Sequence, residues 1–154
     1  MILNRQRAVR VARRPLEFFL SRVRQELDLS DANVTVCLVS DAEIARMNEA
    51  YRKKKGATDV LSFPAVERRA PVSLRRMRKR SASRNEPGAH FLGDIAISPA
   101  TARRNAKQLG RTLPGELKIL ILHGVLHLLG YDHERDRGQM DRLEQRMRRR
   151  LGLT

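Results

Sequence analysis

The residues of this chain that are best suited to chemistry are the histidines of "HGVLHLLGYDH", at positions 123–133. His123 and His127 are one turn apart on a helix, so both imidazoles can reach one ion at about 2.0–2.1 Å. Gly130 is placed to end that helix and let the chain turn back, which brings His133 toward the same point. The spacing therefore predicts a metal site with three nitrogen ligands: His123, His127 and His133.

The ligand set favours zinc. Three neutral imidazoles suit Zn²⁺ better than Mg²⁺, which prefers oxygen ligands. A fourth position without a protein ligand is typical of catalytic zinc, which can activate a water or act as a Lewis acid. We therefore predict one Zn²⁺ per chain. Asp132 is a candidate to accept the distal N–H of a ligand histidine, although an aspartate is equally common in a turn.

The same stretch differs from the zinc protease pattern H-E-x-x-H-x-x-G-x-x-H at one position, where Gly124 replaces the glutamate. In those proteases the glutamate accepts a proton from the zinc-bound water and passes it to the leaving amine. A metalloprotease-like hydrolase would need another carboxylate, with Asp132 or Glu134 as candidates. Phosphodiester cleavage depends less on such a carboxylate, because a metal and cationic groups can stabilise the developing negative charge.

The charge of the chain indicates a polyanionic partner. There are 32 Lys and Arg against 17 Asp and Glu, a formal net charge of +15. Clustered cations neutralise phosphates, which is the main sequence-independent term in nucleic-acid affinity. The alternative is an arginine-rich surface with no specific partner.

The most biased segment is "VERRAPVSLRRMRKRSASRNEPGAH", at positions 66–90. Like charges repel, and Ser, Pro and Gly interrupt any regular pattern, so we predict a mobile basic loop there. Its candidate RNA-binding residues are Arg75, Arg76, Arg78, Lys79 and Arg80.

Two features favour a reducing cytoplasm. The single cysteine, Cys37, stands in the alternating run "NVTVCLVS" and is expected to be an apolar strand residue. The N-terminal "MILNRQRAVR" has no apolar stretch of signal-peptide length, and the apolar region at about 119–129 is too short to span a membrane. We expect a cytoplasmic protein with no membrane partner.

Apolar periodicity predicts an α+β (α/β-like) fold in a single domain over residues 1–154. The predicted strands are 2–5, 33–39, 58–64 and 93–98, and the predicted helices are 15–27, 40–52, 99–109, 114–129 and 135–151. The helix at 114–129 is apolar almost all round, which is typical of a buried helix. We therefore expect a small mixed sheet of about four strands packed with about five helices, with the metal site on a buried central helix.

The histidine stretch, together with "MNEAYRKKKGATDVLSFP" and "LGDIAIS" in that order, resembles the bacterial YbeY family, the metal-dependent endoribonucleases of ribosomal RNA maturation and ribosome quality control. The likeness runs from about Asn4 to Leu151. It implies that His123, His127 and His133 bind zinc and that Arg52, in the "YR" pair, is the functional arginine of the cleft. It also implies a small mixed sheet covered by helices, a cytoplasmic setting and single-stranded RNA as substrate. The segment 66–90 departs from the family by being longer and more basic.

Two hypotheses of different class follow. The first is a zinc-dependent, single-strand-specific endoribonuclease that acts on ribosomal RNA. The second is a ribosome-associated RNA-binding assembly factor whose zinc site is structural or vestigial. Under either hypothesis the partners are RNA, in particular ribosomal RNA, and the small ribosomal subunit, and the basic charge is consistent with both. Arg52 has a physical case of its own, because a planar guanidinium at a helix end can grip a phosphate with two hydrogen bonds. The alternative is an ordinary surface arginine in "YRKKK".

Overall fold

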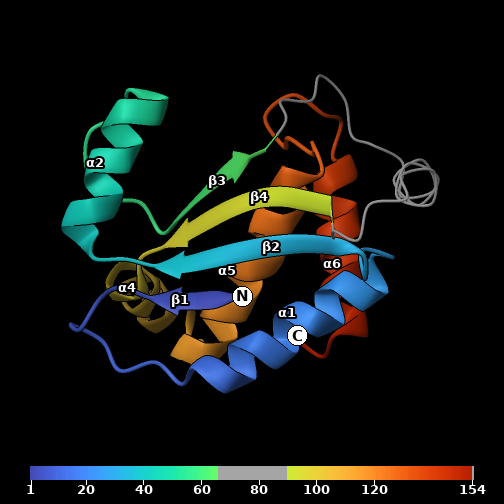
Figure 1. The fold of residues 1–154 in the computed structure, drawn as a ribbon, viewed down its shortest axis with the longest axis horizontal. Helices are drawn as coiled ribbons and strands as arrows, with labels where there is room; N and C mark the ends of the chain where they lie inside the picture. Colours follow the sequence, from blue (N-terminus) through green and yellow to red (C-terminus); the bar gives the residue numbers. More distant parts are fainter. Residues whose placement is uncertain (66–89, 154) are drawn as a thin grey trace.

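A computed structural model of the chain describes residues 1–65 and 90–153, which form a four-stranded sheet and helices that cover it (Figure 1). The strands are β1 (Ile2–Asn4), β2 (Ala32–Leu38), β3 (Val60–Pro64) and β4 (His90–Ile97). Their order across the sheet is β1-β2-β4-β3, and β3 is the antiparallel edge strand beside three parallel ones. The mixed sheet is therefore as predicted.

The basic segment falls outside this description, apart from His90, the first residue of β4. The candidate RNA-binding residues Arg75, Arg76, Arg78, Lys79 and Arg80 therefore lie outside the described residues.

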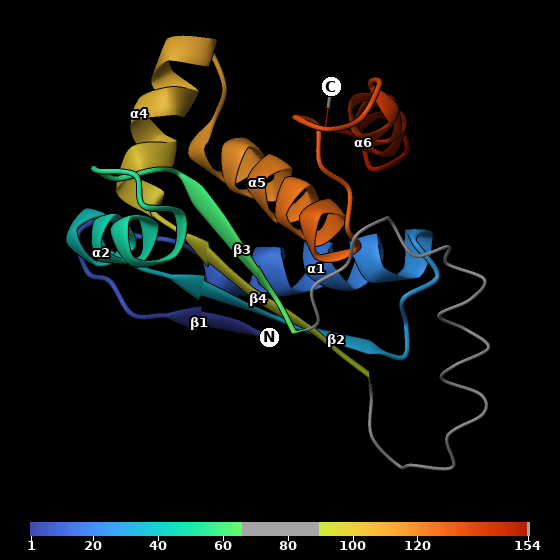
Figure 2. The ribbon, with the colours of Figure 1, turned by 90° about the horizontal axis from the view of Figure 1, so that it is seen from above.

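Five helices occur in the described parts of the chain, in agreement with the predicted α+β fold. They are α1 (Arg13–Glu26), α2 (Asp41–Arg52), α4 (Pro99–Leu109), α5 (Leu113–Leu128) and α6 (Gln139–Arg150). Helices α1 and α5 cover one face of the sheet, and α4 and α6 pack against α5 (Figure 2). On the other face, α2 joins a smaller apolar cluster with β3 and β4. No helix within 1–65 and 90–153 has the length and apolar character needed to cross a membrane.

Helix α5 is the central element of the core. It contacts α1, α4, α6, β3 and β4, so little of its surface reaches solvent. Its buried apolar side chains are Leu117, Ile119, Leu120, Ile121, Leu122, Val125, Leu126 and Leu128. Burying a side chain of this size stabilises the fold by roughly 1.5–3 kcal/mol. The prediction of a buried central helix is confirmed, and the histidines of α5 are held on a rigid support.

The end of α5 reverses the chain as predicted for Gly130. The N–H of Gly130 donates to the carbonyl of His127 at 2.9 Å, and the N–H of Tyr131 donates to the carbonyl of Leu126 at 3.2 Å. This pair of bonds is a Schellman motif, which requires a left-handed residue at the first position after the cap. Gly130 supplies it with φ = 98°. The chain therefore turns back over the end of the helix, and His133 follows this turn.

The last helix begins later than predicted, at Gln139 and not near residue 135. The Asp136 carboxylate accepts hydrogen bonds from the N–H groups of Gly138 and Met140, both at 2.8 Å. Gly138 has φ = 87°, which a helix cannot contain. Because aspartate competes for backbone N–H groups in this way, the helix starts after it. The longer connection leaves His133 in a turn between α5 and α6.

Candidate metal centre

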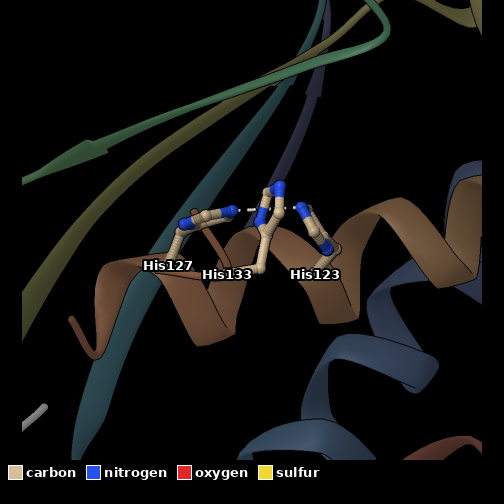
Figure 3. A group of neighbouring side chains, drawn as sticks. All are labelled: His123, His127 and His133. Atoms are coloured by element: carbon tan, nitrogen blue, oxygen red, sulfur yellow. Dashed lines mark hydrogen bonds between the residues drawn. The ribbon is translucent and has the colours of Figure 1, made fainter. Parts of the chain in front are cut away.

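The three predicted ligand histidines lie together (Figure 3). Their ligand atoms are all within 4.8 Å of one another, and His123 Nε2 is 3.0 Å from His127 Nε2. Two nitrogens on one tetrahedral zinc are about 3.3 Å apart when each Zn–N bond is about 2.0–2.1 Å. The pair on α5 therefore already has a separation close to what one ion requires.

His133 is the adjustable member of the group. Its ring centroid lies 5.7 Å from that of His123 and 5.6 Å from that of His127, against 4.6 Å between the two helical rings. His133 is exposed and sits in the turn after α5, so its ring can rotate toward the other two. The three residues form a group that could hold a metal ion, with two ligands fixed by a buried helix and the third brought by a turn.

The electrostatics of His127 suit a metal ligand. Its pKa is lowered from 6.5 to about 4, mainly by burial and also by the neighbouring His123 and His133. Only the neutral imidazole can donate a lone pair to a metal. His127 is therefore in its ligand form at neutral pH.

Gly124 explains why the zinc protease glutamate is absent. The residue is buried, and a Cβ built on it would lie 2.8 Å from Ile95 Cδ1 and 2.9 Å from Ile95 Cγ2. Its carbonyl accepts a hydrogen bond from Ser62 Oγ at 3.2 Å. Position 124 therefore faces β3 and β4, where a glutamate side chain would collide with the sheet. A protease base cannot be supplied from this position.

The carboxylate predicted to contact a ligand histidine, that of Asp132, is engaged in the turn. Its Oδ1 accepts from the N–H of Glu134 at 3.0 Å, and its Oδ2 lies 3.4 Å from Arg135 Nε. The charge of Asp132 still acts on His127, whose pKa it raises against the larger effect of burial. Glu134, the other candidate base of the protease hypothesis, is exposed beside it.

The carboxylate that contacts a histidine is Glu144 of α6, which the sequence analysis missed. Its Oε1 lies 2.7 Å from His123 Nδ1, and its Oε2 accepts from Arg148 Nη2 at 2.9 Å. Burial raises the pKa of Glu144, but the hydrogen bonds and charges of His123 and Arg148 outweigh burial and leave it below its usual value. The sequence did contain an indication that Glu144 is buried. It lies four positions after Met140 and three before Met147, on the apolar stripe of this helix.

Arg52 is exposed as the last residue of α2. The ring of the preceding Tyr51 meets the ring of Phe63 on β3 edge to face, with centroids 4.5 Å apart. Phe63 belongs to the apolar cluster beneath α2, whereas the neighbouring Ser62 points to the opposite face of β3 and contacts Gly124 of α5. The edge strand β3 therefore connects the helix end that carries Arg52 with the helix that carries the histidines.

Comparisons with known proteins agree with this fold. The family model described as Endoribonuclease YbeY matches residues 2–152. The chain is 43% identical to Endoribonuclease YbeY of Solibacter usitatus over 149 residues, which cover 96% of this chain and 86% of that protein. It is 39% identical to the protein of the same name from Koribacter versatilis, with coverage of 99% and 86%. The solution structure of TM1509 from Thermotoga maritima superposes with a TM-score of 0.61 at 26% identity, covering 98% of this chain and 89% of that one.

Proposed function

The chain belongs to the endoribonuclease YbeY family, and on this premise we propose that it is a zinc-dependent, single-strand-specific endoribonuclease of ribosomal RNA maturation and ribosome quality control. The observation that carries the proposal is the group of His123, His127 and His133. The net charge of +15 supports a polyanionic substrate. A cytoplasmic setting and the small ribosomal subunit as partner belong to the same proposal.

The donor set fits zinc. Three imidazole nitrogens converge, and one of them, on His127, is kept neutral by burial. Carboxylate ligands, which Mg²⁺ would require, are not part of this group of three. When bound, Zn²⁺ would supply a Lewis acid for phosphodiester cleavage. The protein would hold the ion through His123, His127 and His133.

RNA cleavage by metal-loaded protein tests the proposal directly. Wild-type protein loaded with Zn²⁺ is expected to cleave single-stranded RNA, and His123→Ala is expected to lose both the ion and the cleavage. Elemental analysis measures the ion, and gel electrophoresis of a labelled RNA measures the cleavage. Full zinc occupancy in a variant in which His123, His127 and His133 are all replaced by alanine would contradict the ligand assignment. Zinc-loaded wild type that binds RNA without cutting it would favour the assembly-factor hypothesis.

We further propose that Arg52 holds a phosphate of the substrate. Its neighbour Tyr51 fixes the end of α2 against β3, so the guanidinium projects from a positioned helix end. Arg52→Ala is expected to lower cleavage by roughly 10²–10³-fold, as for loss of a charge-stabilising contact in the transition state. Zinc content and thermal stability should stay as in the wild type. Lys54→Ala, which removes a nearby exposed cation, is the matched control.

We propose that the RNA-binding surface extends over a cluster of basic residues, because clustered cations neutralise phosphates. The cluster consists of Arg75, Arg76, Arg78, Lys79 and Arg80. Replacing the four arginines with serine should flatten the salt dependence of RNA affinity by up to about 0.7 log units per lost contact.

The control for this experiment replaces four exposed arginines near the N-terminus, Arg7, Arg10, Arg13 and Arg14, and changes the net charge equally. If the two variants show the same salt dependence, net charge alone explains the effect. An unchanged slope in the first variant would remove these residues from the RNA-binding surface.

A further inference from the structure

Glu144 is an almost fully buried carboxylate whose two oxygens have different partners. Oε1 contacts His123 Nδ1 at 2.7 Å, and Oε2 accepts from Arg148 Nη2 at 2.9 Å. Glu144 is 7% exposed, and the side chain of Arg148 is 16% exposed. Contacts this short between groups shielded from water restrict both partners to one geometry.

The bond to Glu144 determines which nitrogen of His123 is free. An ionised carboxylate only accepts hydrogen bonds, so Nδ1 of His123 carries the proton and donates it. In the neutral ring, Nε2 then bears the lone pair. Nε2 is also the atom that lies 3.0 Å from His127 Nε2. The bond therefore selects the tautomer in which His123 offers its free nitrogen to the centre of the histidine group.

Packing of α6 fixes the position of the carboxylate. Met140 and Met147 are buried on the same face of the helix, one turn before and one turn after Glu144. Arg148 lies one turn after Glu144 and holds the second oxygen. The carboxylate is thus held by the core on one side and by an arginine on the other, and it has little freedom to leave His123.

We propose that Glu144 is a positioning residue of the metal centre, which orients His123 and sets its tautomer, and that Arg148 holds Glu144 in place. The inference rests on the metal site of the proposed function and deepens it. A carboxylate on the distal nitrogen of a ligand histidine fixes the ring and raises its basicity, and loss of such a partner typically lowers metal affinity about 10–100-fold.

The chain offers a matched control. Glu116 of α5 is also buried, at 3% exposure, and pairs with Arg111 Nη1 at 3.0 Å. It lies seven residues before His123, nearly two turns away along the same helix. Glu116→Gln and Glu144→Gln each neutralise one buried, arginine-paired carboxylate. A general effect of charge removal would appear in both variants, whereas a positioning effect would appear only in Glu144→Gln.

The test measures Zn²⁺ affinity by competition with a chromophoric chelator, together with the visible spectrum of the Co²⁺-loaded protein. Glu144→Gln is expected to weaken Zn²⁺ binding about 10–100-fold and to change the Co²⁺ spectrum. Glu116→Gln is expected to bind as the wild type. Arg148→Lys, which keeps the charge beside Glu144, should bind more tightly than Arg148→Met.

A second readout uses the metal-free protein. The ¹⁵N shifts of His123 should show the Nδ1–H tautomer in the wild type and a mixture in Glu144→Gln, because an amide can donate as well as accept. Wild-type Zn²⁺ affinity in Glu144→Gln, alongside loss of binding in His123→Ala, would overturn the proposal. If Glu144→Gln does not fold, unchanged Zn²⁺ affinity in Arg148→Met would overturn the role of the pair.

The affinity measurement needs no RNA, which separates this inference from the proposed function. If the wild type and the variants bind Zn²⁺ in the predicted order of affinity, but the wild type cleaves no RNA, the nuclease is contradicted and the role of Glu144 is supported. If the wild type cleaves RNA, but Glu144→Gln binds Zn²⁺ with wild-type affinity, the nuclease is supported and the role of Glu144 is contradicted. Wild-type protein that binds no Zn²⁺ would overturn both.

Discussion

Helices α5 and α6 lie side by side and meet at the histidine group, but they are built differently. Ten of the sixteen residues of α5 are buried, against three of the twelve in α6. His123 and His127 come from α5, and the carboxylate that contacts His123 comes from α6. The two histidines stand out in the sequence of an apolar helix, whereas Glu144 is one charged residue in "QMDRLEQRMRRR".

This difference teaches where a sequence reveals function. A polar group in a buried helix is costly unless it has a partner, so its presence in an apolar pattern needs a reason. Glu144 is also buried and carries this cost, but it stands in a segment rich in charged residues, so its sequence context does not single it out. The chemistry of α5 is therefore visible in the sequence, and the chemistry of α6 depends on which face meets α5.

The largest expected difference between the helices is in stability. Ile121 of α5 has 0% exposure, and Ile121→Ala is expected to cost about 4 kcal/mol through lost burial and the cavity left behind. Arg146→Ala, on the exposed side of α6, should change the free energy of unfolding by no more than about 0.5 kcal/mol. Urea unfolding of the metal-free proteins measures both values. Similar losses would show that α6 is as central to the core as α5.

A smaller loss is expected for Gly124→Ala. The added Cβ would meet Ile95 at 2.8–2.9 Å, and overpacking of this kind outweighs the gain in helix propensity, for a net cost of about 1–2 kcal/mol. Ile95→Val removes Cδ1, the nearest atom, so the double variant should be more stable than the sum of the single effects predicts. Unfolding free energies of the four proteins give the coupling. Stabilisation by Gly124→Ala alone would mean that α5 can move away from β4.

Acid titration separates the ionisable groups of the two helices. Burial lowers the pKa of His127 to about 4, below its ordinary 6.5, so between these values the unfolded chain binds more protons than the folded one. The free energy of unfolding should therefore fall as pH drops from 6.5 toward 4, by up to about 1.4 kcal/mol per pH unit.

His127→Gln should lose this part of the slope when metal-free protein is unfolded at a series of pH values. Glu144 acts in the same direction but at lower pH: its lowered pKa stabilises the fold above the ordinary carboxylate pKa of 4.5, and this contribution is lost as pH falls below that value. The window between pH 4.5 and 6.5 therefore reports on His127 and not on Glu144. An unchanged slope in His127→Gln would show that His127 is not the group responsible.

The smallest effect is expected at the contact of α5 with the edge strand. Ser62→Ala removes the 3.2 Å hydrogen bond to the Gly124 carbonyl, at a cost of about 0.5 kcal/mol, because that carbonyl keeps its place in the helix ladder. Gln145→Ala, on the exposed side of α6, is the control and should have no measurable effect. Thermal melts of both variants measure the loss of stability. A loss of more than about 1.5 kcal/mol in Ser62→Ala would mean that β3 depends on this bond for its position.

Local patterns predicted the elements well but placed some boundaries wrongly. The predicted starts of α2 and α4 are close to the observed ones, where Ser40 and Ser98 cap the helices by each accepting a hydrogen bond from the N–H of the third residue after it. The start of α6 was predicted about four residues early, because Asp136 and Gly138 interrupt a helical pattern that periodicity alone would extend. Short-range hydrogen bonds of this kind compete with the helix and are easily missed in a charged segment.

The sequence by itself determined the group that could hold a metal ion, because histidines at positions 123 and 127 share a helix face and Gly130 can adopt the left-handed conformation that turns the chain back toward His133. It also determined the buried helix that carries them, since an all-round apolar pattern has no other stable place in a small domain. Only the tertiary structure decided that Gly124 faces Ile95 and that Glu144 contacts His123. Those contacts join residues far apart in the chain, and their geometry depends on how α5 packs on β4 and α6, which no local pattern encodes.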